Sequence, residues 1–169
     1  MDATSRGDEV DLLRLDRQVC FGLAVAARNV IALYRPLLEP MGLTHPQYLV
    51  MLALWERSPR SVGELARVLA LDPATLSPLL KRLESAGLVD RRRTPGNERS
   101  VSVSLTADGA ALRAQAERIP PAIVERLGMP IEELEQLRGV LDRVIAASQP
   151  RESQPHGSQP HGARSGGVA

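Results

Sequence analysis

Apolar residues recur every three or four positions along the first part of the chain, and this spacing predicts helices. The pattern over residues 12–33 predicts an amphipathic helix of about six turns that ends before Pro36, since proline disfavours a helical conformation in the residue ahead of it. Thr44 and Gln47 form the sequence of a capping box, with proline between them, so a second apolar helix is expected from there through Trp55.

Two shorter helices follow, each opened by a capping residue. Ser61 and Glu64 form a second capping box, which predicts a helix over residues 62–70. Asp72 caps a further helix with Pro73 at its first position, and Gly87 follows its end.

After Gly87 the apolar period changes from 3.6 to 2. Valine and leucine alternate with serine over residues 100–105, which predicts a half-buried strand, and residues 89–93 are its expected partner. The loop between them contains Pro95 and Gly96. The segment therefore predicts a β-hairpin with arginines on its flank.

Helical spacing returns behind the hairpin. Thr106 caps a helix expected over residues 107–118, Pro120-Pro121 interrupts it, and a last helix covers residues 131–147. Residues 149–169 repeat Ser-Gln-Pro and offer almost nothing apolar to bury, so they predict a disordered tail. His156 and His161 in this tail lack further ligands, and no metal site is expected.

Composition narrows the class of protein. The 169 residues are 43% hydrophobic and 24% charged, with a net charge of +1 and few aromatics, which suits one helical globular domain, here residues 8–148. The single cysteine excludes an intrachain disulfide. No long apolar run or signal peptide was found, so a cytoplasmic protein is expected. Phosphate-binding loops and nucleophile elbows are missing too, so neither an enzyme nor a cofactor is predicted.

The fold class that fits is mainly α with a small β-hairpin: a winged helix-turn-helix over residues 44–106, which reads DNA with its second helix and its hairpin. Leucines at i, i+3, i+4 and i+7 turn one face of that helix to the core. The polar side chains left outside this stripe are predicted to contact DNA: Thr75, Ser77, Lys81 and Arg82. The alternative is a small helical bundle with a solvated hairpin.

Long amphipathic helices flank the winged unit, over residues 8–36 and 107–148, and their apolar stripes need a partner. Packing against a second copy predicts a homodimer that presents two recognition helices to a pseudo-palindromic DNA site.

Cys20 is the one reactive candidate. Tyr34 lies 14 residues further along the same predicted helix, so the two side chains are about 21 Å apart and meet only through another chain or a sharp bend. On pattern alone, a lone cysteine beside an apolar stripe is more often an inert packing residue than a reactive one.

Several segments together resemble a known family: Val19-Cys20-Phe21-Gly22-Leu23, Tyr34-Arg35-Pro36-Leu37-Leu38, Pro46-Gln47-Tyr48-Leu49, Leu71-Asp72, Thr75-Leu76, Pro78-Leu79-Leu80-Lys81-Arg82 and Glu98-Arg99-Ser100-Val101 leading to Leu105-Thr106. On these residues the chain resembles the MarR winged-helix repressors, and within them the OhrR branch of organic-hydroperoxide sensors.

The resemblance implies a dimer in which the sensing cysteine, matched by Cys20, is hydrogen-bonded by tyrosines of the partner chain. Tyr34 matches one of those tyrosines, whereas His45 and Ala24 stand where the family usually has tyrosine. A protonated His45 can stabilise a thiolate, a neutral one can donate a hydrogen bond, and an ordinary surface histidine is the third possibility.

The resemblance also assigns DNA contacts in the hairpin. Arg99 matches the wing-tip arginine that enters the minor groove, while Arg91, Arg92 and Arg93 are either backbone contacts or solvated charge. Asn97 replaces the acid that usually orients the wing arginine.

The function expected is a DNA-binding repressor released when an organic hydroperoxide oxidises Cys20 to a sulfenic acid, which then reacts with a low-molecular-weight thiol, pairs with another protein's cysteine or over-oxidises. One alternative is a repressor released by a small aromatic or phenolic ligand, with Cys20 structural. Another, from a different class, is a thiol peroxidase.

Overall fold

A computed structural model describes residues 11, 13–94 and 97–148, with the side chains of residues 94–100 outside the description. The expected tail, residues 149–169, and the loop residues Pro95 and Gly96 also lie outside the described residues. The chain divides into two compact units, one ending at Gly128 and the other beginning at Met129. A single domain over residues 8–148 therefore stays a prediction.

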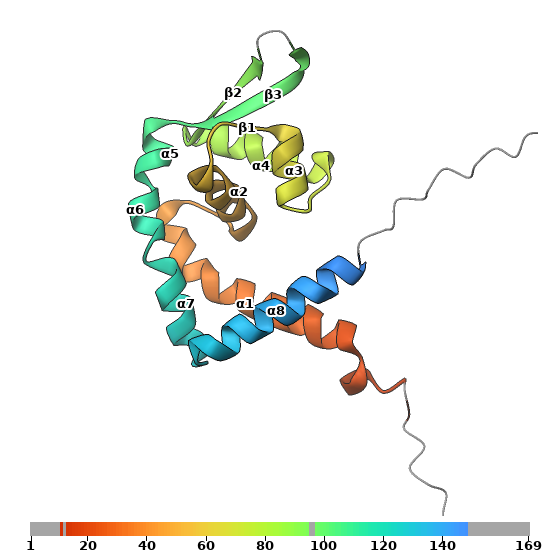
Figure 1. Cartoon of the computed structure of the whole chain (residues 1–169). Coiled ribbons are helices and arrows are strands. Elements are labelled where there is room, and N and C mark those ends of the chain that lie inside the picture. The colour runs from red at the N-terminus through yellow and green to blue at the C-terminus, as the bar shows by residue number, and fades with distance from the viewer. Residues whose placement is uncertain (1–10, 12, 95–96, 149–169) are drawn as a thin grey trace, which may run out of the picture. The chain divides into compact units, whose positions relative to one another are not determined.

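The first long helix is α1, Val19–Leu38, preceded by a short 3-10 turn at Leu15–Arg17 (Figure 1). The prediction that it begins at residue 12 and ends before Pro36 was wrong at both ends. Leu13 and Leu15 are exposed, so among the described residues no burial of these side chains favours extending the helix to them. Pro36 removes only one backbone donor, and the helix continues past it because Leu38 is anchored in the core.

The second helix, α2, spans His45–Glu56 and confirms the predicted capping box. The backbone N–H of Thr44 donates to Oε1 of Gln47 at 2.8 Å, and the Thr44 hydroxyl donates to the same oxygen. Half of the residues of α2 are buried, because α1 and the helix-turn-helix pack against it.

The helix-turn-helix consists of α3, Val62–Val68, and α4, Pro73–Ser85. At the start of α3 the Ser61 hydroxyl accepts from the Glu64 backbone N–H, and the backbone N–H of Ser61 and the Arg57 guanidinium hold the pKa of the Glu64 carboxyl at about 2. Gly87 ends the segment with φ of +73°, a conformation that glycine adopts at little cost.

The sheet has three antiparallel strands, β1 at Arg60–Ser61, β2 at Val89–Thr94 and β3 at Asn97–Leu105, in the order β1-β3-β2. The β2–β3 hairpin is the predicted wing, and Figure 1 shows it projecting beyond α3 and α4. Strand β1 was not predicted, since two residues carry no readable period.

Three short helices follow the wing: α5 at Ala107–Ala111, α6 at Arg113–Ala116 and α7 at Ile119–Leu127. The predicted single helix over 107–118 is thus divided into two, and Pro120 and Pro121 lie in the first turn of α7, where a missing N–H matters least. In the second unit, α8 spans Ile131–Ser148, in agreement with the prediction for residues 131–147.

Leucine dominates the core of the first unit. Its largest fully buried side chains come from α1, α2, α3, α4 and the wing strands: Leu38, Met51, Leu54, Leu65, Leu76, Leu80, Leu83, Val50, Val89 and Val103. The core therefore lies among α2, the helix-turn-helix and the base of the wing.

Among the described residues one stretch, Val19–Met41, is long and apolar enough to cross a membrane by length and composition. It carries two arginines, Arg28 and Arg35, along its length. A helix that buries one apolar face against another protein has the same composition.

Gly109 makes the closest backbone approach of the described glycines. A Cβ built there lies 2.0 Å from the carbonyl oxygen of Leu88, whereas a Cβ on Gly63 in α3 meets nothing within 4 Å. We expect Gly109→Ala to lower the free energy of unfolding by about 2 kcal/mol or more, because backbone must move. Gly63→Ala is the matched control and should leave stability unchanged or raise it slightly. Urea unfolding followed by circular dichroism tests this, and equal stabilities of the two variants contradict it.

Candidate DNA interface and redox site

The exposed face of α4 carries the predicted recognition residues. Leu76, Leu79, Leu80 and Leu83 are buried, as the spacing predicted. The side chains of Thr75, Ser77, Lys81 and Arg82 are all exposed. The helix therefore offers hydroxyl groups and cations to solvent along one face, which base edges and phosphates accept.

Thr75 has a second role that the sequence pattern did not reveal. Its hydroxyl donates to Oδ2 of Asp72 at 2.7 Å, and its backbone N–H donates to Oδ1 at 2.8 Å. These bonds lower the pKa of the Asp72 carboxyl and fix the first turn of α4.

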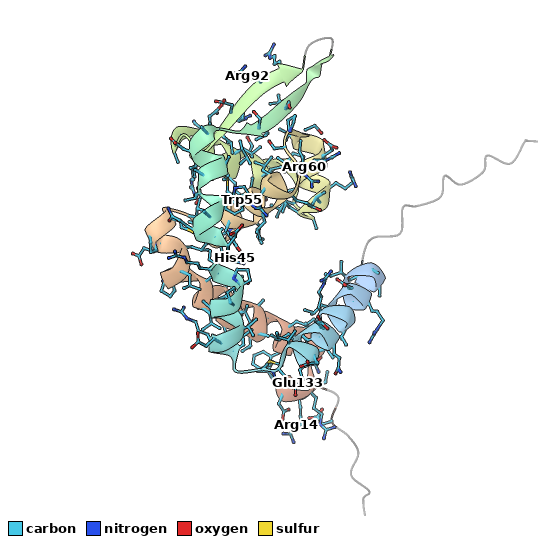
Figure 2. The ribbon with its side chains drawn as sticks, turned by 60° about the vertical axis from the view of Figure 1, so that its left-hand side comes forward. Arg14, His45, Trp55, Arg60, Arg92 and Glu133 are labelled. Atoms are coloured by element: carbon cyan, nitrogen blue, oxygen red, sulfur yellow. The ribbon has the colours of Figure 1, made fainter. Side chains whose placement is uncertain are left out.

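The three arginines of β2 are not equivalent. The side chain of Arg92 is 82% exposed and lies 3.9 Å from an oxygen of Asp90, and Arg93 is also exposed. Arg91 is only 27% exposed and turns toward α4, where its Nη1 lies 3.8 Å from Oε2 of Glu84. Arg91 is thus placed between wing and recognition helix, while Arg92 is open to solvent (Figure 2).

Arg99, the predicted wing-tip contact, lies in β3, but its side chain is outside the described residues. Within β3, Val101 pairs with Arg93 and Ser102 with Arg92, so the strand's course beside β2 is defined up to the bulge between Arg93 and Thr94.

The predicted redox residues fall into two separate places within one chain. Cys20 is a free, exposed cysteine in the first turn of α1. Tyr34 lies 14 residues further along the same continuous helix, which corresponds to about 21 Å of axial rise. No bend closes that gap, so one chain does not bring Cys20 to Tyr34.

Tyr34 and His45 do come together. Their ring centroids are 5.0 Å apart in an edge-to-face arrangement, and Tyr48 follows at 6.0 Å from Tyr34. Trp55 extends the row at 6.3 Å from Tyr48, and its Nε1–H donates to the Gly109 carbonyl at 2.8 Å. The rings therefore join α1, α2 and α5.

Burial sets the protonation of these rings. It lowers the pKa of His45 below the usual 6.5 and raises the pKa of the Tyr34 phenol. At neutral pH His45 is therefore mostly uncharged. Of the roles considered for it, this direction favours a neutral hydrogen-bonding ring over a cation that stabilises a thiolate.

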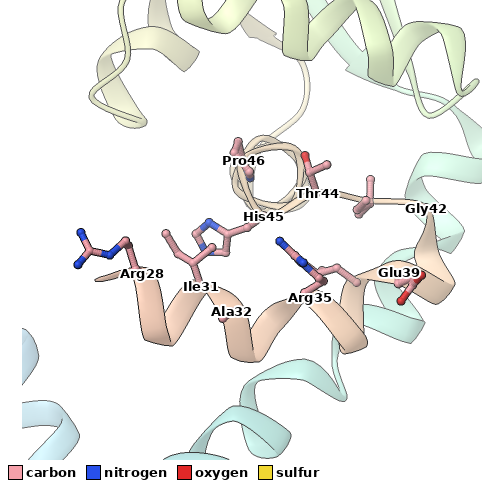
Figure 3. Close-up of a pocket in the computed structure, with 11 residues that line it drawn as sticks. Arg28, Ile31, Ala32, Arg35, Glu39, Gly42, Thr44, His45 and Pro46 are labelled. Atoms are coloured by element: carbon pink, nitrogen blue, oxygen red, sulfur yellow. The ribbon is translucent and has the colours of Figure 1, made fainter. Parts of the chain in front are cut away.

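His45 also lines a cavity of about 560 Å³ between α1 and the start of α2 (Figure 3). Arg28 and Arg35 lie two turns apart on α1 and line it, together with the apolar side chains of Ile31 and Leu43. Its volume falls within the range of about 300–1,000 Å³ typical of small-molecule sites. The seven-residue spacing of Arg28 and Arg35 could have predicted from the sequence that both side chains lie on the same face of α1.

Comparisons with known proteins place the chain. Residues 43–101, the winged helix-turn-helix, match the family model described as MarR family. The organic hydroperoxide resistance transcriptional regulator of Bacillus subtilis is 41% identical over 134 residues, which cover 79% of this chain and 91% of that protein. The chain belongs to the MarR family. It is therefore a winged-helix, DNA-binding transcriptional regulator.

Further relatives support the assignment to the MarR family. MgrA of Staphylococcus aureus is 34% identical over 138 residues, covering 81% of this chain and 94% of that protein. The solved structure of reduced AbfR bound to DNA has a TM-score of 0.66 at 33% identity and covers 79% of this chain and 94% of that one; AbfR comes from Staphylococcus epidermidis. Overoxidised AbfR bound to DNA matches equally well.

The state of His45 has a measurable consequence for this MarR protein. Its pKa is lower in the folded protein than in the unfolded chain, so the unfolded chain takes up the proton first as the pH falls. We expect the free energy of unfolding of the wild type to fall relative to His45→Gln below about pH 6.5 and to run parallel to it above. Chemical unfolding of both proteins between about pH 5 and 8 measures this. A wild type that gains relative stability in acid contradicts the assignment of a neutral ring.

Proposed function

We propose that this MarR regulator is a cytoplasmic homodimeric repressor that leaves its operator when an organic hydroperoxide oxidises Cys20. The observation that carries the proposal is the exposed Cys20 in the first turn of α1, in a chain 41% identical to a hydroperoxide resistance regulator. Solved structures of AbfR in reduced, overoxidised and disulfide forms support redox control in a relative.

The dimer follows from the surface of α1. Val19, Phe21, Leu23 and Ile31 are exposed on this helix, although apolar side chains of that size are normally covered. A second copy that packs there covers them and brings Cys20 of one protomer to the ring pair of the other, Tyr34 and His45. The separation of about 21 Å within one chain then needs no bend.

The chemistry uses only groups present in the chain and the oxidant. The Cys20 thiolate attacks the terminal oxygen of the hydroperoxide, an S–O bond forms, the O–O bond breaks, and the alkoxide leaves and takes up a proton to become an alcohol. Tyr34, whose raised pKa keeps it a phenol, and neutral His45 are the hydrogen-bond donors for the reacting oxygens.

The sulfenic acid has no second cysteine in its own chain to react with. It therefore condenses with a small thiol, loses water and forms a mixed disulfide, pairs with a cysteine of another protein, or is oxidised further. Each product adds bulk or charge beside the dimer contact. The dimer then shifts toward a form in which the two recognition helices no longer fit their half-sites.

On the DNA, α4 supplies Thr75, Ser77, Lys81 and Arg82 to the major groove. The wing supplies Arg99 to the minor groove, and Arg92 and Arg93 contact phosphates. Arg91 is assigned to the Glu84 contact instead of the DNA, because it is half-buried against α4.

Cys20→Ser tests the proposal directly. Fluorescence anisotropy on the duplex from upstream of its own gene measures affinity before and after one equivalent of cumene hydroperoxide. We expect the wild type to lose affinity by about tenfold or more on oxidation, and Cys20→Ser to bind equally well in both conditions, since serine presents no thiolate. Release of Cys20→Ser by the oxidant contradicts the proposal.

The cavity lined by Arg28, Arg35 and His45 favours one second candidate, a repressor released by a small aromatic or phenolic ligand, with Cys20 structural. Benzoate in place of the hydroperoxide, added to Cys20→Ser on the same duplex, distinguishes the two. Release of this variant by benzoate together with an oxidant-insensitive wild type favours the ligand.

A further inference from the structure

Among the described residues, two polar side chains are buried, Gln47 and Arg60, and each is 7% exposed. They lie at opposite ends of α2. Gln47 belongs to the capping box at its first turn, and Arg60 lies four residues past its last residue, Glu56. Arginine stays charged inside a protein, so its burial is costly unless every part of the guanidinium has a partner.

Arg60 finds its partners at the carboxyl end of α2. Its Nε donates to the carbonyl of Ala53 at 2.9 Å and to that of Arg57 at 3.2 Å, and its Nη2 donates to Oε2 of Glu56 at 2.7 Å. The carboxyl end of a helix carries partial negative charge, so a cation there is favourable, and the Ala53 carbonyl accepts from Arg60 in addition to the backbone N–H of Arg57 at 3.3 Å. The side chain of Arg60 is thus fixed to the end of α2.

The backbone of Arg60 pairs with a strand of the wing. In β1 it pairs with Val103 of β3, and Ser61 pairs with Ser102. Just ahead of β1, the Ser58 hydroxyl accepts from the backbone N–H of Leu105 at 3.1 Å. One residue therefore joins the end of α2 through its side chain and the wing strand β3 through its main chain.

Helix α2 also packs against α4, the recognition helix. Helix α2 therefore contacts both DNA-reading elements. It packs directly against α4, and Arg60 connects its carboxyl end to β1, which pairs with the wing strand β3. Strand β2 also packs against α4, and the contact between Arg91 and Glu84 that joins them is long, at 3.8 Å, whereas Arg60 makes three shorter bonds to the end of α2 and the residue after it.

We propose that Arg60 is a positioning residue for DNA binding: by tying β1 to the end of α2 it holds the wing where Arg99 meets the minor groove while α4 occupies the major groove. The proposal rests on the wing contact of Arg99 and not on redox sensing. Arg60 itself is buried and touches no phosphate. Its loss should therefore reproduce the loss of Arg99 on DNA.

The test is a double-mutant cycle on the reduced full-length protein, with Arg60→Met, Arg99→Ala and the double variant. Anisotropy on the duplex from upstream of its own gene gives Kd at several salt concentrations. We expect Arg99→Ala to weaken binding about tenfold and to reduce the salt slope by about 1, and Arg60→Met to do nearly the same. The double variant should bind no more weakly than Arg99→Ala alone.

Two further variants support the cycle. Arg113→Met removes an arginine from the exposed surface of α6 and should leave both Kd and the salt slope close to wild type. Arg60→Lys retains one cationic donor and should lie between Arg60→Met and wild type; it replaces Arg60→Met in the cycle if that variant does not fold by circular dichroism.

Losses that multiply in the double variant overturn the proposal, because Arg60 then acts on something other than the wing contact. An unchanged salt slope in Arg60→Met overturns it as well, since a merely less stable protein loses affinity without losing a phosphate contact. So does an Arg99→Ala variant that binds like wild type. None of these outcomes depends on whether Cys20 responds to oxidant.

Discussion

The fixed rise per residue of an α-helix sets the distance between the candidate redox residues of this chain. Helix α1 runs without a break from Val19 to Leu38, and it therefore keeps Cys20 about 21 Å from Tyr34 along its axis. The same helix carries large apolar side chains that the rest of the first unit, up to Gly128, leaves exposed. Under the proposed function, a second copy of the chain laid along α1 supplies both the missing rings and the missing contact.

Helix α2 is the element on which the functional parts depend. Its first turn presents His45 to the cavity and to Tyr34, its middle packs against the recognition helix, and its last carbonyls receive Arg60 from the base of the wing. A change beside His45 therefore acts on a helix that contacts both DNA-reading elements. In the proposed mechanism, release from DNA requires no unfolding, because a small shift of α2 would alter the spacing between α4 and the wing.

Features fixed by local chemistry could be predicted from the sequence. The capping boxes at Thr44 and Ser61, the Asp72 cap and the leucine stripe of α4 all depend on residues within one or two turns. The limits of α1 could not be predicted in the same way. Its start depends on what Leu13 and Leu15 can cover, and its passage through Pro36 depends on the burial of Leu38.

The residues of the candidate site also differ in whether local sequence or tertiary packing determines their role. Exposure of the four recognition residues followed from their spacing, and the resemblance paired Cys20 with Tyr34 and His45. The roles of Arg91 and Arg60 were hidden, because their partners Glu84 and Ala53 are reached only through the packing of β2 against α4 and of β1 against α2. No pattern in the sequence distinguishes an arginine that faces DNA from one that turns inward.

Mixed dimers test the shared site most directly. One protomer carries Cys20→Ser, and the other keeps Cys20 but carries Tyr34→Phe with His45→Phe; the two are co-expressed with different tags and purified as a pair. Mass spectrometry then follows the rate at which cumene hydroperoxide oxidises the remaining Cys20. If the site is built from two chains, this cysteine faces the intact rings of the other protomer and reacts at the wild-type rate. A rate as slow as that of the dimer carrying both ring substitutions in each chain contradicts the account, because it places the whole site within one protomer.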